Sequence, residues 1–157
     1  MIADRSGQTL KGEGTLANIR FSRAVILVRI IVGWVFLSEG IQKFLFSTDL
    51  GAGRFAKIGI PAPEIMAPFV GYVEVVFGIC ILMGIITQYA AIPLVIDMVV
   101  AFVSTKIPIL MQQGFWKMAH EARVDLAMLF CLVFLVLVGP GEWSLDEMYG
   151  TWRRGQR

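Results

Sequence analysis

Six ionisable side chains lie within stretches of sequence that are otherwise apolar, and these residues are the best placed to do chemistry. An ionised side chain at the centre of a bilayer costs at least about 2.5 to 3.5 kcal/mol, so each one needs a compensating partner or a functional reason. A buried acid can deliver protons, and a buried cation can hold the oxygen atoms of a ligand. The candidates for such an intramembrane polar site are Arg29, Glu39, Lys43, Glu74, Asp97 and Asp125.

The first apolar stretch carries its charges on one face of a helix. Residues that follow one another at steps of four, three, four and three form a single stripe: Arg29, Gly33, Phe36, Gly40 and Lys43. Glu39 flanks this stripe and lies four residues before Lys43, which is the favourable order for a helical ion pair. The two glycines allow a neighbouring helix to come close. The stripe is therefore predicted to face protein and not lipid.

The later apolar stretches each carry one acid. Gly71, Glu74 and Gly78 share a helix face, so the Glu74 carboxyl is expected between two glycines on a surface suited to close packing. Asp97 falls near the centre of the third stretch, and Asp125 falls near the start of the fourth. Val73-Glu74 precedes Cys80 by the same interval as Val124-Asp125 precedes Cys131, a short echo that would make the two halves a parallel repeat.

The composition predicts one integral membrane domain. The 157 residues are 57% hydrophobic and 17% charged, with a mean hydropathy of +0.72, which is far more apolar than an ordinary soluble domain. We predict an all-α, integral membrane four-helix bundle over residues 24–141, with spans at about 24–46, 65–86, 89–106 and 123–138. A polar N-terminal arm (1–23), expected to be mobile, precedes it, and a charged, solvated C-terminal tail (142–157) follows it. The first span should stay as an anchor, because it is longer than a signal-peptide core.

The connections and charges give a topology. The segment 47–64 contains several Gly and Pro residues and is expected to be an extramembrane loop, whereas 107–121 should lie along the interface, with Trp116 as an anchor. Lys and Arg residues number seven near the two termini against five in the loops, so the positive-inside rule favours cytoplasmic termini.

Several classes of function are disfavoured by composition. The net charge of +2 and the lack of a basic run interleaved with aromatics argue against nucleic acid. Cys80 and Cys131 have no second Cys at metal or redox spacing, so we interpret them as buried, inert thiols. Because His120 is the sole histidine, no metal site is predicted, and one copy cannot supply two axial haem ligands. Any metal redox centre would belong to a partner.

Four motifs occur in order along the chain, in three apolar or loop segments and in the run that follows the last span. Their residues are Arg29, Gly33, Gly40, Lys43, Phe55, Gly59, Pro61, Glu74, Gly78, Gly84 and the run from Gly139 to Asp146. This pattern resembles the DoxX family of small bacterial and archaeal membrane proteins, over roughly residues 21–146. The resemblance implies a four-helix protein of the inner membrane. The family takes its name from a subunit of a thiosulfate:quinone oxidoreductase, and some members are linked to membrane oxidoreductase complexes that handle oxidative stress.

The first hypothesis is a quinone-linked redox subunit or accessory, with no cofactor in the chain itself other than a bound quinone. Glu74 or Glu39 would donate protons, and Lys43 or Arg29 would hold the carbonyl oxygens. The structural alternative is that Glu74 bonds Arg29 or Lys43 across helices and only fixes packing. Trp34 or Phe36 would pack against the quinone ring. His120 is a less favoured candidate for a quinone ligand.

Two further hypotheses remain open. The acids Glu39, Glu74, Asp97 and Asp125 would line a polar path for protons or small solutes, and four helices per chain would then require homo-oligomers. Alternatively, the bundle is a scaffold that docks a soluble or membrane oxidoreductase, and its charges only set helix register. In every case the lipid bilayer is a partner and nucleic acid is not.

Overall fold

The structure, a computed structural model, consists of helices. It describes the backbone of residues 5–148 and the side chains of residues 22–148. Over this range it has no strand, in agreement with the all-α prediction. The helices are α1 (Arg5–Leu45), α2 (Ala52–Lys57), α3 (Pro63–Met83), α4 (Thr87–Gln113) and α5 (Phe115–Val138).

Within the described part of the chain, three segments are long and apolar enough to cross a membrane: Ser22–Leu45, Pro63–Met83 and Thr87–Gln113. The helix α5 carries Lys117, Glu121, Arg123 and Asp125 in its first half. Its uncharged remainder of about 13 residues reaches about 20 Å, which is less than a hydrocarbon core of about 30 Å. A fourth crossing by α5 therefore stays a prediction, as does the cytoplasmic location of the termini.

The helices extend beyond the expected spans. The polar N-terminal segment is helical from Arg5 and continues directly into the first span. The helix α4 runs on to Gln113, so the segment 107–121 belongs mainly to α4 and α5, which meet at Gly114 with a φ of 83°. The loop after α1 contains the short helix α2.

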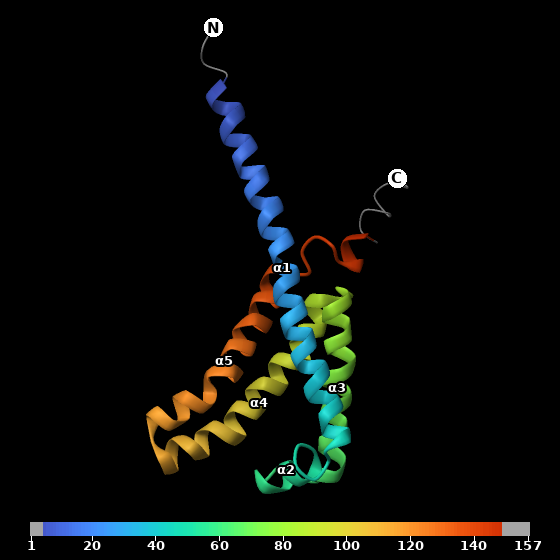
Figure 1. Cartoon of the computed structure of the whole chain (residues 1–157), viewed down its shortest axis with the longest axis vertical. Coiled ribbons are helices and arrows are strands. Elements are labelled where there is room, and N and C mark those ends of the chain that lie inside the picture. The colour runs from blue at the N-terminus through green and yellow to red at the C-terminus, as the bar shows by residue number, and fades with distance from the viewer. Residues whose placement is uncertain (1–4, 149–157) are drawn as a thin grey trace.

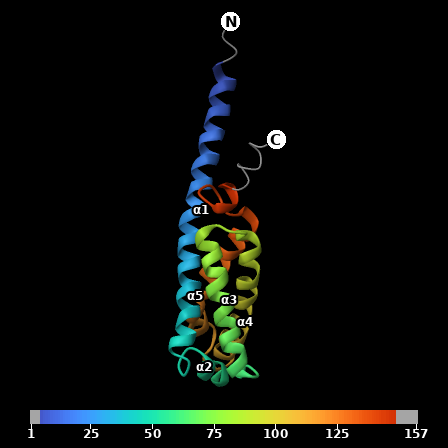
Figure 2. The same ribbon diagram turned by 90° about the vertical axis from the view of Figure 1, so that its right-hand side faces the viewer.

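The long helices form two hairpins. The helix α1 packs along α3, and α4 packs along α5, while contact between the two hairpins is less extensive. Figure 1 shows the hairpins close together where α3 turns into α4 and farther apart towards the end where α2 lies. Figure 2, seen from the side, places α2 across that same end of the bundle. The bundle is therefore tight at one end and open at the other.

Glycines bring the backbones of α1 and α3 together. A Cβ atom added to Gly33 would lie 2.8 Å from the carbonyl oxygen of Gly78, and one added to Gly40 would lie 2.8 Å from that of Gly71. Contacts this short leave no room for any side chain. The four predicted packing glycines thus lie in one seam.

The seam provides a first testable prediction. Because a Cβ at Gly78 would lie 2.9 Å from the backbone nitrogen of Leu37, Gly78→Leu should separate the helices and lower the unfolding free energy by about 3 kcal/mol. Unfolding by SDS, followed by circular dichroism in mild detergent, measures this loss. Ala127→Leu, at an exposed position of α5, adds the same bulk and should change little. Equal stability of both variants would contradict the close seam.

The tight end is held by a buried arginine. Arg29 is 1% exposed and donates hydrogen bonds to the carbonyl oxygens of Ile81 (3.0 Å) and Leu82 (2.9 Å) at the end of α3. It also donates to those of Pro140 and Trp143, both at 3.2 Å, in the segment after α5. One side chain thereby joins α1, α3 and the C-terminal segment.

The beginning of the C-terminal tail folds onto the bundle through Ser144 and Asp146, in place of the solvated segment expected from Glu142 onward, whereas Trp143 and Met148 are exposed. The carboxylate of Asp146 accepts hydrogen bonds from the backbone N–H groups of Ile86 (2.8 Å) and Thr87 (3.2 Å) at the start of α4. Ser144 is 1% exposed. The physical reason is that the first N–H groups of a helix have no partner within the helix, and this segment supplies acceptors for them. The rest of the predicted tail lies outside the described residues.

Candidate functional site

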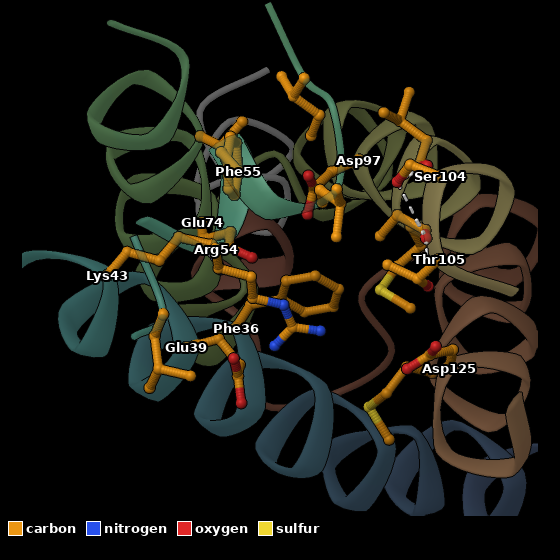
Figure 3. Close-up of a pocket in the computed structure, with 18 of the residues that line it drawn as sticks. Phe36, Glu39, Lys43, Arg54, Phe55, Glu74, Asp97, Ser104, Thr105 and Asp125 are labelled. Carbon is orange, nitrogen blue, oxygen red and sulfur yellow. Dashed lines mark hydrogen bonds and ion pairs between the residues drawn. The ribbon is translucent and has the colours of Figure 1, made fainter. Parts of the chain in front are cut away.

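A cavity of about 280 Å³ lies between the two hairpins. All four long helices line it, α2 adds Arg54 and Phe55, and the residue after α2 adds Ile58 (Figure 3). Phe55 is buried and anchors α2, whereas Arg54 is exposed beside it. Most of the lining is apolar, and within it lie the ionisable groups Glu39, Lys43, Arg54, Glu74, Asp97 and Asp125.

The centre of the site is an ion pair between α1 and α3. The Nζ atom of Lys43 lies 2.5 Å from Oε2 of Glu74, and the two side chains are 12% and 5% exposed. The glycine seam makes the pair possible, because a Cβ on Gly40 would already lie 3.0 Å from Cβ of Glu74. Lys43 therefore pairs across helices with Glu74, and not with Glu39 on its own helix.

Asp97 on α4 joins this pair. Its carboxyl lines the same cavity as Glu74 and interacts electrostatically with Glu74 and Lys43. Two carboxyl groups that interact in this way can share a proton. We call Lys43, Glu74 and Asp97 the inner cluster.

A second ion pair lies between α4 and α5. Nζ of Lys106 is 2.9 Å from Oδ2 of Asp125, with side-chain exposures of 10% and 28%. Each hairpin thus has a lysine on its first helix and an acid on its second, and these acids are the ones in the sequence echo noted above. Figure 3 shows Asp125 across the cavity from Lys43 and Glu74. We call Lys106 and Asp125 the outer pair.

Two charged groups face the cavity without an internal partner. Among the residues whose side chains are described, neither Glu39 nor Arg54 makes a hydrogen bond or ion pair. Figure 3 shows the Arg54 guanidinium pointing into the cavity. Its five N–H donors are therefore available to a ligand.

The structure brings together five of the six predicted polar residues. Arg29 lies at the opposite, tight end, where backbone carbonyls hold its guanidinium. Phe36 lines the cavity, but Trp34 is 66% exposed on the outer surface. His120 is exposed on α5 and does not line the cavity. Cys80 and Cys131 are free thiols that pack against the core.

Sequence reasoning missed several residues of the site. Arg54 lies in a segment expected to be loop, although its neighbour Phe55 was part of the family pattern. Ser104 and Thr105 line the cavity, yet hydroxyl residues are common on apolar helices and give no distinct signal. For Lys106 the signal was present: it is a charged residue within an apolar helix, followed by an acid on the next helix, as Lys43 is.

These features define a class: a helical membrane protein with a mainly apolar cavity that holds charged groups between two hairpins. The family model for DoxX matches residues 24–107. The chain belongs to the DoxX family.

Three bacterial proteins are similar over most of their length. The uncharacterized membrane protein Rv3486 of Mycobacterium tuberculosis is 54% identical over 130 residues, covering 79% of this chain and 80% of that protein. An uncharacterized protein of Haemophilus influenzae is 31% identical, covering 78% and 87%. The putative oxidoreductase CatD of Bacillus subtilis is 23% identical, covering 82% and 89%. No solved structure matches the chain.

Proposed function

We propose that this protein is a quinone-binding subunit of a membrane oxidoreductase system and that the cavity is its quinone site. The observation that carries the proposal is the buried pair of Lys43 and Glu74 in the wall of a largely apolar cavity. A quinone, when bound, supplies an apolar ring with two acceptor oxygens that takes up two electrons and two protons. The proposal puts the chain in the bacterial cytoplasmic (inner) membrane.

The size and lining of the cavity fit a single-ring head group. Its 280 Å³ is near the lower end of ligand pockets, which start at about 300 Å³. The aromatic rings of Phe36 and Phe55 are part of the lining and offer faces for stacking. An isoprenoid tail does not fit in the same volume and would lie in lipid.

The charged groups supply the contacts that such a ligand needs. Lys43 has three N–H donors, so donors remain for a carbonyl oxygen beside its contact with Glu74. Arg54 offers donors from the α2 side of the cavity. Glu74 can give a proton to the same oxygen that Lys43 holds, and Asp97 can return one to Glu74. These residues bind the head group and transfer protons to it.

The electrons would come from a partner oxidoreductase. The name of the Bacillus subtilis relative, a putative oxidoreductase, supports a redox setting for this protein. A partner of this kind would dock on a surface of the bundle from which quinone can still enter the cavity. A chain that only assembles such a partner would bind no quinone, so direct binding separates the two functions.

Binding of menadione or ubiquinone-1 to the purified protein in lipid nanodiscs tests the proposal. Wild type should bind one equivalent, and Lys43→Met combined with Glu74→Gln should weaken binding by at least about tenfold, since hydrogen bonds to charged groups contribute about 1.5 to 3 kcal/mol. Isothermal titration calorimetry gives both stoichiometry and affinity.

A matched control removes an ion pair away from the cavity. Lys117 and Glu121 pair at 3.0 Å on the surface of α5, with side chains 50% and 42% exposed. Lys117→Met combined with Glu121→Gln should bind quinone as wild type does. Folded wild type that binds neither quinone would refute the proposal, and proteins that copurify with it would then identify what it assembles.

A further inference from the structure

The acid of the outer pair is more exposed than Glu74 of the inner cluster, whereas Lys106 is as buried as Lys43. On α4, Lys106 follows Asp97 by nine residues, or about 13 Å of helix, towards the turn into α5. The side chain of Asp125 is 28% exposed, compared with 5% for Glu74. Both acids line the same cavity. The cavity therefore connects a partly exposed carboxyl group to a buried one.

Hydroxyl groups line the cavity wall of α4 beside the outer pair, and Met98, Val100 and Ala101 line it between these hydroxyls and Asp97. Ser104 donates a hydrogen bond to the carbonyl oxygen of Val100 (2.7 Å), and Thr105 donates to that of Ala101 (2.7 Å). Because each hydroxyl proton is used in this way, the oxygen lone pairs remain as acceptors for water or a protonated group. On the α1 side, by contrast, Val35 and Phe36 line the cavity beside Glu39.

We propose that the outer pair is the entrance of a proton path that runs along the cavity wall of α4 and ends at Glu74. A proton from bulk water binds the Asp125 carboxylate and passes by way of water held at Ser104 and Thr105 to Asp97. Asp97 transfers it to Glu74, and each carboxylate returns to its starting state when its proton moves on. No electrons travel along the path.

This inference rests on the proposed function only for the use of the proton, which Glu74 would give to the reduced ligand. Lys106 holds the Asp125 carboxyl in place at the entrance, and Lys43 holds that of Glu74 at the end. The charged and titratable groups that face the path are Glu39 and Lys43 on α1, Arg54 on α2, Glu74 on α3, Asp97 and Lys106 on α4, and Asp125 on α5.

Hydrogen-deuterium exchange at the Glu74 carboxyl tests the path without any quinone. Protein in nanodiscs is mixed from H₂O into D₂O at a pH where the carbonyl stretch of protonated Glu74 is visible by infrared spectroscopy, the band being assigned by its loss in Glu74→Gln. Asp125→Asn should slow exchange at this band by at least about tenfold, as expected for loss of a positioned proton carrier. Asp125→Glu should restore the rate.

Two further variants make the result decisive. Asp125→Asn with Lys106→Met leaves no unpaired charge, keeps the fold and should exchange as slowly as the single variant. Glu39→Gln, at the other exposed acid of the cavity, should exchange at the wild-type rate. Wild-type exchange in Asp125→Asn, slow exchange in Glu39→Gln alone, or no protonated Glu74 at any pH at which the protein stays folded would overturn the path. Failure to bind quinone, with these exchange rates as expected, would refute the proposed function alone.

Discussion

Arg29→Met should lower the free energy of unfolding by about 4 kcal/mol, because buried carbonyl groups lose a charged donor and each such loss costs about 1 to 3 kcal/mol. The guanidinium serves four carbonyl oxygens, on α3 and on the segment after α5. Methionine fills much of the volume but donates nothing. SDS titration followed by circular dichroism measures the loss.

The same helix supplies a matched control. Arg23 also bonds the C-terminal segment, through Glu142 at 2.9 Å, but its side chain is 61% exposed. Arg23→Met should therefore cost less than about 1 kcal/mol, as surface ion pairs do. Arg29→Lys should lie between the two, because an ammonium lacks the planar fork that reaches several acceptors. Equal losses in the two methionine variants would show that Arg29 does not hold the bundle end.

Lys43→Met should cost about 3 to 5 kcal/mol of stability, because it leaves the Glu74 carboxylate buried without its cation. The Glu74 side chain is 5% exposed, and Asp97 nearby adds a second acid and no compensating charge. The same SDS titration at neutral pH detects this loss. Lowering the pH should reduce it, since a protonated Glu74 no longer needs a cation.

The double variant separates charge from shape. Lys43→Met with Glu74→Gln removes both charges and should recover most of the stability, because replacing a whole buried pair is often nearly neutral. A double-mutant cycle over the four proteins gives the coupling energy. If the double variant is as unstable as the sum of the single ones, the pair does not act as a unit. Loss of quinone binding in a stable double variant would then report on the site and not on folding.

Polar side chains at the two ends of the bundle differ in what they contact. At the tight end, Arg29 donates four hydrogen bonds to backbone carbonyls and Asp146 accepts two from backbone N–H groups, so both side chains hold structure. At the open end, Arg54 and Glu39 have no internal partner among the described side chains, and the inner cluster borders a cavity. Chemistry is therefore expected where the hairpins diverge.

Much of this arrangement follows from sequence alone. Helical periodicity put Arg29, Gly33, Phe36 and Gly40 on one stripe, and all four are buried. Apolar length and composition predicted a membrane protein with helical spans, because a bilayer admits few other backbone structures. These features depend on local pattern, which a sequence shows directly.

Only the tertiary structure decided which charges meet. Glu39 and Glu74 look alike in sequence, yet one is exposed and the other is paired with Lys43. Arg29 and Lys43 share a stripe, but 14 residues of helix, or about 21 Å, place them at opposite ends of the bundle. Which partner each one finds depends on the register between helices, on the folding of α2 and residues 139–148 against the bundle, and on the splay of the hairpins. Helical periodicity determines the face on which a side chain lies, but the neighbour across that face is chosen by packing between segments far apart in the chain.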